Sequence, residues 1–151
     1  MSLNEEVELL RRIPLFAKIE ASKLKLLAFT SQRLTYKPGD VLFHQGDPGD
    51  AAFVIIGGEA DVMVDAPGGQ LKVAHLKQND FVGEIAILCD VPRTATVIAA
   101  TEVTTLRIEK DLFFRLIADF PQIAIEIMRV LAQRLERTTT DLRTLSAKLK
   151  S

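Results

Sequence analysis

A carboxylate and a guanidinium stand close together in the segment from Phe81 to Val97, which reads FVGEIAILCDVPRTATV. The carboxylate belongs to Glu84, which directly follows Gly83, and the guanidinium belongs to Arg93. A guanidinium offers a planar fork of hydrogen bonds to a phosphate, and an ionised carboxylate accepts a hydrogen bond from a hydroxyl. The segment therefore suits a small ligand that carries both a hydroxyl group and a phosphate.

The residues around this pair favour the same chemistry. Gly83 has no Cβ, so the backbone there can approach a ligand closely. The apolar stretch Ile85–Leu88 fits a short helix, whose first N–H groups would attract an anion. Pro92 restricts the backbone before Arg93, and Thr94 adds a hydroxyl beside it. The alternative is that the carboxylate and the guanidinium form a structural ion pair in a domain that has lost its ligand.

Composition bounds the class of protein. The chain has 151 residues, of which 48% are hydrophobic and 26% are charged, and its formal net charge is −1. We expect one domain, residues 1–151, with no general attraction to nucleic acid or anionic lipid. No apolar run approaches the ~20 residues of a membrane span, and no signal peptide is visible. The single cysteine, Cys89, excludes an intrachain disulfide and favours a reducing, cytoplasmic location.

The cysteine and histidine counts argue against metal and redox chemistry. One cysteine is too few for the about four thiolates that hold an iron–sulfur cluster within one chain. The two histidines, His44 and His75, are well separated, so a metal-dependent cupin site is not expected. We expect a non-enzymatic protein with no metal and no cofactor, in which Cys89 is a small apolar filler of the short helix.

Three regions must position the central segment. Residues 4–31 have the apolar spacing of helices, and residues 109–151 return to that spacing, with Pro121 opening a second helix. Residues 33–108 hold short apolar alternations and all eight glycines. This pattern predicts a mainly β fold with flanking helices, in which the strands form a jelly-roll barrel. The expected strands are Val41–Phe43, Phe53–Ile56, Asp61–Val64, Leu71–Val73, Ala95–Ile98 and Val103–Leu106, with hairpin turns at Gly57-Gly58 and Gly68-Gly69.

The last helix, residues 121–150, carries apolar residues at alternating spacings of four and three. A seam of this kind, sustained over more than three heptads, predicts a coiled coil, so we expect a homodimer through this helix. The alternative is a helix that packs on its own barrel. Thr138 is the polar exception in the seam. The seam residues are Ala124, Met128, Leu131, Leu135, Thr138, Leu142, Leu145 and Leu149.

The Phe81–Val97 segment resembles the phosphate-binding cassette of cyclic nucleotide-binding domains, which occur in catabolite activator-like regulators and in cyclic-nucleotide-dependent kinases and channels. That cassette is a Gly-Glu-aliphatic-Ala block, a short helix, and then Pro-Arg followed by Ala or Thr and Ala; this chain matches it without a gap. The resemblance extends through Gly39, Gly46 and Gly58 at the barrel turns. It implies a small jelly-roll barrel with helices before it and two after it.

The resemblance also implies a role for each cassette residue. Glu84 would accept the ribose hydroxyl, while Arg93 and the N–H of Ala86 would hold the cyclic phosphate. Gly83 and Ile85 would line the pocket. The implied function is a regulatory module whose cassette moves inward and whose C-terminal helices repack when a cyclic nucleotide binds. The alternative function is a ligand-free dimerisation or interaction module on the same fold.

Three threonines bear on which cyclic nucleotide would bind. In the family, a threonine directly after the arginine can contact guanine, so Thr94 leaves cGMP open, although bacterial cAMP regulators also carry a hydroxyl residue there. In the catabolite activator-like branch, a hydroxyl pair on the long helix contacts adenine at the dimer interface. Thr138 and Thr139 occupy a similar place, so we expect cAMP rather than cGMP.

Catabolite activator-like regulators continue into a helix-turn-helix domain, whereas this sequence ends at Ser151. No recognition helix and no basic patch are visible, so we expect no direct DNA binding by this chain and no membrane partner. The chain is expected to be either a stand-alone sensor or a part of a longer regulator.

Overall fold

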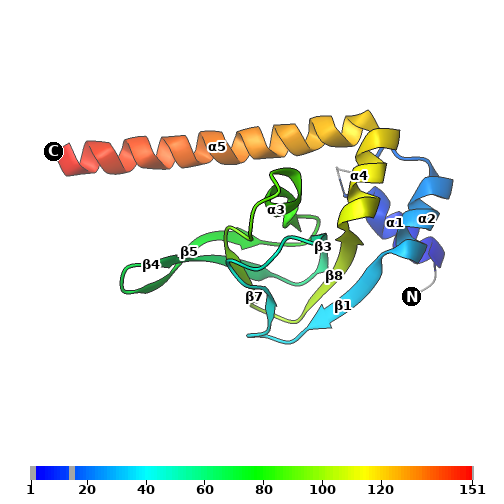
Figure 1. Ribbon diagram of the computed structural model, residues 1–151, viewed down its shortest axis with the longest axis horizontal. Helices are drawn as coiled ribbons and strands as arrows, with labels where there is room; N and C mark the ends of the chain where they lie inside the picture. Colours follow the sequence, from blue (N-terminus) through cyan, green and yellow to red (C-terminus); the bar gives the residue numbers. More distant parts are fainter. Residues whose placement is uncertain (1–2, 14–15, 151) are drawn as a thin grey trace. The chain divides into compact units, whose positions relative to one another are not determined.

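The structure is a computed structural model that describes residues 3–13 and 16–150 (Figure 1). The chain divides into two compact units, Met1–Arg115 and Leu116–Ser151. The helices are α1 (Leu3–Arg11), α2 (Ala21–Thr30), α3 (Glu84–Leu88), α4 (Lys110–Asp119) and α5 (Pro121–Lys150). The strands are β1 (Gln32–Tyr36), β2 (Val41–Phe43), β3 (Ala51–Gly57), β4 (Ala60–Ala66), β5 (Gly69–Leu76), β6 (Phe81–Val82), β7 (Thr96–Ala99) and β8 (Val103–Glu109).

The strands of the first unit form two four-stranded sheets, in the orders β1-β8-β3-β6 and β2-β7-β4-β5. Every pairing is antiparallel. The predicted mainly β jelly roll with flanking helices is therefore confirmed. Burial of apolar side chains drives this packing, and the residues of the buried core cluster come from both sheets: Ile55, Ala60, Leu76, Val97, Ala99 and Val103.

The hairpin turn predicted at Gly68-Gly69 is confirmed, because β4 and β5 pair on either side of it and Ala66 lies opposite Gly69. The hairpin predicted at Gly57-Gly58 is wrong. The strand before it, β3, already has β8 and β6 as its neighbours. The turn therefore connects a strand of one sheet to a strand of the other sheet. Two apolar runs separated by Gly-Gly are compatible with either connection, so the sequence pattern alone does not distinguish them.

Three connections between strands use the same turn chemistry. In each, an aspartate carboxylate accepts a hydrogen bond from the backbone N–H three residues earlier, while the aspartate's own N–H donates back to the carbonyl of that residue. The residue before the aspartate has a positive φ, which glycine and asparagine tolerate best. The turns are Lys37–Asp40, His44–Asp47 and Lys77–Asp80.

The N-terminal helices α1 and α2 belong to the same unit as the strands. Leu10, Leu24 and Leu27 are almost completely buried. Arg33 at the start of β1 forms an ion pair with Glu6 of α1 at 2.9 Å. These contacts fix the entry of the chain into the barrel.

The second unit consists of the end of α4 and the 30-residue helix α5, which begins at Pro121 as predicted. The buried apolar side chains of α5 are Ile123 and Ile127 in its first two turns. Further along, the predicted seam is exposed within one chain: Leu135 is 68% exposed and Leu142 is 61% exposed. The apolar seam residues beyond Ile127 are thus left largely uncovered within one chain.

Candidate functional site

The strand β6 passes into the helix α3 through Gly83, which has a φ of 93°. A Cβ at this position would lie 2.6 Å from Nη1 of Arg93 and 3.2 Å from the carbonyl oxygen of Ala51. Both the left-handed backbone and the close approach of the guanidinium require glycine here.

The helix α3 buries one face. Glu84, its first residue, is only 1% exposed, and Ala86 is also buried, whereas Ile85 is 39% exposed. The segment before β3 packs tightly against this helix, because a Cβ at Gly49 would clash with the Cβ of Ala86. The first N–H groups of a helix have no partner inside it, so the buried carboxylate of Glu84 and these donors mark one end of the site.

Arg93 reaches back toward the start of α3, and its side chain is 2% exposed. Nη1 donates a hydrogen bond to the carbonyl oxygen of Gly83 at 2.9 Å, and Nη2 donates to that of Ala51 at 2.6 Å. The guanidinium carbon lies 4.2 Å from the centroid of the Phe43 ring. The buried Nε has no hydrogen-bond partner among the described residues. The hydrogen bonds of the cation thus go to neutral carbonyl groups, and one of its three nitrogens, Nε, makes none.

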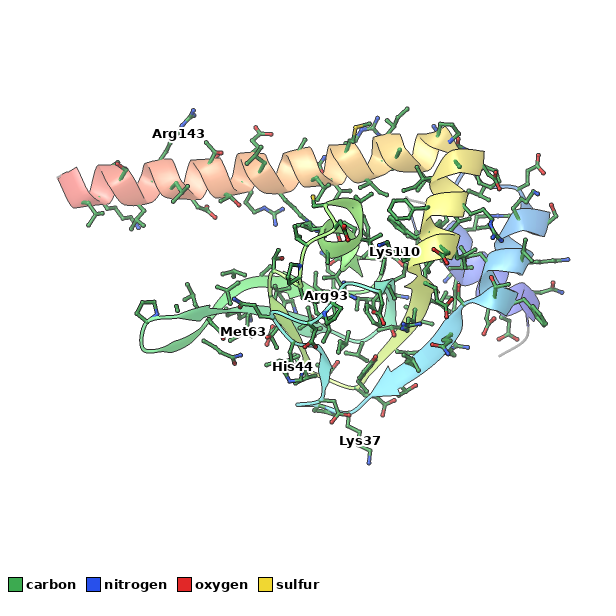
Figure 2. The ribbon with its side chains drawn as sticks, viewed as in Figure 1. Lys37, His44, Met63, Arg93, Lys110 and Arg143 are labelled. Atoms are coloured by element: carbon green, nitrogen blue, oxygen red, sulfur yellow. The ribbon has the colours of Figure 1, made fainter. Side chains whose placement is uncertain are left out.

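The backbone of Arg93 is fixed as well as its side chain. Its N–H donates to the carbonyl of Asp47, and its own carbonyl accepts from the N–H of Gly46, both at 2.8 Å. Both partners belong to the turn between β2 and β3. Figure 2 shows Arg93 between α3 and His44, the residue that opens this turn.

The charges around Arg93 compensate its burial only in part. Burial lowers the pKa of its guanidinium, and the carboxylates of Asp50, Asp47 and Glu84 oppose that shift. Arginine nevertheless stays protonated at physiological pH. The carboxylate of Asp50 lies 3.6 Å from Nη2 of Arg93 and 2.9 Å from Nη2 of Arg107.

Asp50 also touches the start of the helix that follows the barrel. Its backbone carbonyl accepts a hydrogen bond from the N–H of Lys110, the first residue of α4, at 3.0 Å. One residue therefore contacts Arg93 through its side chain and α4 through its backbone.

The predicted site residues fall into two groups. The first unit brings together those of the cassette: Gly83, Glu84, Ile85, Ala86, Arg93 and the exposed Thr94. The other two, Thr138 and Thr139, belong to α5 in the second unit. The hydroxyl of Thr138 donates to the carbonyl of Arg134 one turn earlier, at 2.9 Å.

Some residues that hold Arg93 were not predicted from the sequence. In the sequence, Phe43 is indistinguishable from any other apolar strand residue. Ala51 contributes its backbone carbonyl, which every residue has, so its residue type carries no signal. Asp50 could have been recognised from the sequence as a candidate, since it is an acidic residue that directly follows the turn cluster Gly46–Gly49 and directly precedes a strand. The expectation that Cys89 fills the short helix is wrong: α3 ends at Leu88, and Cys89 is its exposed C-cap.

The chain was compared with known protein families and structures. The family model described as "Cyclic nucleotide-binding domain" matches residues 33–120. The chain belongs to this family. The match covers the barrel from the second residue of β1 onward and the whole cassette. The buried Arg93 and Glu84 therefore lie within a cyclic nucleotide-binding regulatory domain.

Relatives of this cyclic nucleotide-binding domain include transcriptional regulators and kinase subunits. It is 33% identical over 136 residues to the CRP-like cAMP-activated global transcriptional regulator of Mycobacterium tuberculosis, covering 89% of this chain and 61% of that protein. It is 33% identical over 110 residues to the cAMP-dependent protein kinase regulatory subunit of Colletotrichum orbiculare, covering 73% of this chain and 28% of that protein.

Among solved structures, the Thermus thermophilus catabolite activator protein matches the domain with a TM-score of 0.78 and 28% identity, over 88% of this chain and 63% of that one. The chain therefore spans less than two thirds of each of these three proteins.

The described part of the chain contains neither a metal-binding cluster nor a membrane-spanning helix. Within residues 3–13 and 16–150, no group of three or more His, Cys, Asp or Glu side chains is arranged to hold a metal ion. No helix in that described part of the chain is long and apolar enough to cross a membrane.

The contact between Gly83 and Arg93 gives a first prediction. We expect Gly83→Ala to displace the guanidinium and to abolish the thermal stabilisation expected when a cyclic nucleotide binds to a domain of this family. The matched control is Gly68→Ala, because Gly68 has a φ of 90° but open space where its Cβ would lie. Both variants should lose about 1–3 kcal/mol of stability from backbone strain. Only the control should keep ligand binding, and a Gly83→Ala protein that binds as the wild type does would contradict the prediction.

Proposed function

We propose that this chain is a cyclic nucleotide sensor that binds its ligand at the start of α3. The observation that carries the proposal is the buried cation of Arg93, whose two hydrogen bonds go to carbonyl groups and whose Nε is unpaired. A buried charge without a full complement of partners is unfavourable. The carboxylate in an ion pair with Arg93 is that of the largely exposed Asp50, at 3.6 Å. A cyclic phosphate, which is a monoanion, supplies a closer counter-charge and an acceptor.

In this proposal each cassette residue has one role. Arg93 and the N–H of Ala86 hold the phosphate, and the carboxylate of Glu84 accepts the ribose 2′-hydroxyl. Gly83 and Ile85 line the pocket; the 39% exposure of Ile85 leaves its side chain available to a ligand. These groups bind and orient a ligand, and none of these roles breaks a bond, so the proposed function is regulatory and not enzymatic.

We propose cAMP, rather than cGMP, as the ligand. Thr138 and Thr139 on α5 are the residues proposed to contact adenine, and Thr94 would lie beside the phosphate. The similarity to a cAMP-activated regulator and to a cAMP-dependent kinase subunit supports this choice.

We further propose that the sensor works as a homodimer through residues 121–150 and that ligand binding repacks its C-terminal helices. The exposed leucines of α5 support the dimer. A ligand that prefers one arrangement of these helices shifts the population toward it. Residues 1–151 then act as a single domain, located in the cytoplasm and without direct contact to DNA. The free, exposed Cys89 suits a reducing compartment.

The phosphate contact can be tested by calorimetric titration. We expect Arg93→Ala to remain folded and to lose about 2–5 kcal/mol of binding free energy for cAMP, because it removes a desolvated, charge-assisted contact. The linear nucleotide 5′-AMP is the ligand control, since it has more charge and lacks the cyclic shape. If the wild type shows no thermal shift with any of cAMP, cGMP or 5′-AMP, the chain is instead a ligand-free interaction module.

The choice of nucleotide can be tested on α5. We expect Thr138→Ala and Thr139→Ala each to weaken cAMP binding roughly 5-fold, the effect of one lost hydrogen bond, and to leave cGMP binding unchanged. Thr140→Ala makes the same chemical change one position away and serves as the control. Tighter binding of cGMP than of cAMP by the wild type, with the preference removed by Thr94→Ala, would reverse the assignment.

The dimer can be tested by sedimentation velocity at high protein concentration. Leu135→Lys places a charge in the seam and should give a monomer, whereas Gln133→Lys adds the same charge outside the seam and should leave the dimer intact. A wild-type protein that sediments as a monomer with and without nucleotide would rule out this interface.

A further inference from the structure

The ring of Phe43 forms one wall of the site around Arg93. Its centroid lies 4.2 Å from the guanidinium carbon, within the ~6 Å range of a cation–π contact. Phe43 ends β2, at a bulge where Val41 pairs with Ile98 but Phe43 pairs with Val97. A bulge changes the direction of the side chain that follows it. The backbone of β2 is therefore irregular at the residue that meets the arginine.

A second ring lies nearby but makes a weaker contact. The centroid of Phe53 is 5.9 Å from the guanidinium carbon of Arg93, and the rings of Phe43 and Phe53 are 5.7 Å apart. Because the attraction between a cation and a ring falls with distance, most of the aromatic stabilisation of Arg93 comes from Phe43.

The guanidinium has a competing position available to it. A cavity of about 380 Å³ opens between strands of the two sheets, and Phe43, Asp47, Asp50, Arg93 and Arg107 are among the residues that line it. The Asp50 carboxylate is 3.6 Å from Nη2 of Arg93, and its side chain is 69% exposed. At this distance Asp50 already forms a long ion pair with Nη2. A small movement of Arg93 would shorten that ion pair and take the guanidinium away from the carbonyl of Gly83.

We propose that Phe43 is a positioning residue that keeps the guanidinium of Arg93 at the start of α3 and prevents it from moving closer to the carboxylate of Asp50. The ring replaces water on one face of the cation without supplying an anion, so the charge stays available to a ligand. The inference rests on the proposed role of Arg93 as the phosphate ligand. If Arg93 is in place in only a fraction of the molecules, the apparent affinity equals the intrinsic affinity multiplied by that fraction.

The first test compares cAMP affinity in three variants by calorimetric titration. Phe43→Leu keeps an apolar side chain but removes the ring, and it should weaken binding about 3- to 30-fold, the range of a partly to fully desolvated cation–π contact. Phe43→Tyr keeps the ring and should bind within about 2-fold of the wild type. Phe53→Leu, the matched control, removes the more distant ring and should likewise have only a small effect.

A second arm asks whether the loss comes from the position of Arg93. Adding Asp50→Asn to Phe43→Leu weakens the competing ion pair, so part of the lost affinity should return. Because loss of a carboxylate strengthens anion binding in any background, the recovery must exceed the effect of Asp50→Asn in the otherwise wild-type protein. Simple loss of packing at Phe43 would give no such excess.

A third arm needs no nucleotide. Urea unfolding of the ligand-free protein with Phe43→Leu, Arg93→Met and the double variant forms a double-mutant cycle. We expect the two substitutions to be coupled by about 3- to 30-fold in the unfolding equilibrium constant. This arm tests the contact even if the wild type binds no cyclic nucleotide, a result that would refute the proposed function.

Each result of these experiments either overturns or supports the positioning role of Phe43. The inference is overturned if Phe43→Tyr loses as much affinity as Phe43→Leu, if Phe53→Leu loses as much as Phe43→Leu, or if the unfolding cycle shows no coupling. It is supported by a loss in Phe43→Leu alone, together with partial recovery on Asp50→Asn and coupling in the cycle.

Discussion

The site depends on the burial of one positive charge. Arg93 is almost fully enclosed, yet its hydrogen bonds go to the carbonyls of Gly83 and Ala51. Carbonyl dipoles orient a cation without neutralising it, and the ion pair with the largely exposed Asp50 is long, at 3.6 Å. The burial of the charge is therefore compensated only in part, and a bound anion can complete the compensation. Other features follow from this constraint. A glycine is required at position 83, where the guanidinium lies against the backbone. The turn between β2 and β3 fixes the backbone of Arg93 through hydrogen bonds to its N–H and its carbonyl.

The sequence predicted the cassette because its chemistry resides in side chains. A glycine, a carboxylate, a short apolar helix and an arginine are all visible as residue types. The strands were visible for a similar reason, since six short apolar runs correspond to β2, β3, β4, β5, β7 and β8. In contrast, β1 reads Gln-Arg-Leu-Thr-Tyr, with only two apolar residues and most of its side chains exposed, and β6 has two residues, so both signals are short and weak.

The sequence could not show which residues contact one another across the barrel. The carbonyl of Ala51 belongs to the backbone, and Phe43 becomes a partner of Arg93 only through the pairing of β2 with β7. The change of sheet after Gly57 is a property of topology, since a hairpin and a crossover present the same local residues. Asp50 is a similar case, because its contacts with Arg93, Arg107 and Lys110 join positions that are more than forty residues away in the sequence.

The place of Cys89 has a practical consequence. The chain has one cysteine, and that cysteine is the exposed residue on which the cassette helix ends. A thiol-reactive fluorophore or spin label would therefore attach at a single position, immediately after α3, without any substitution. The natural protein carries its own reporter position for motions of the segment that surrounds the buried cation.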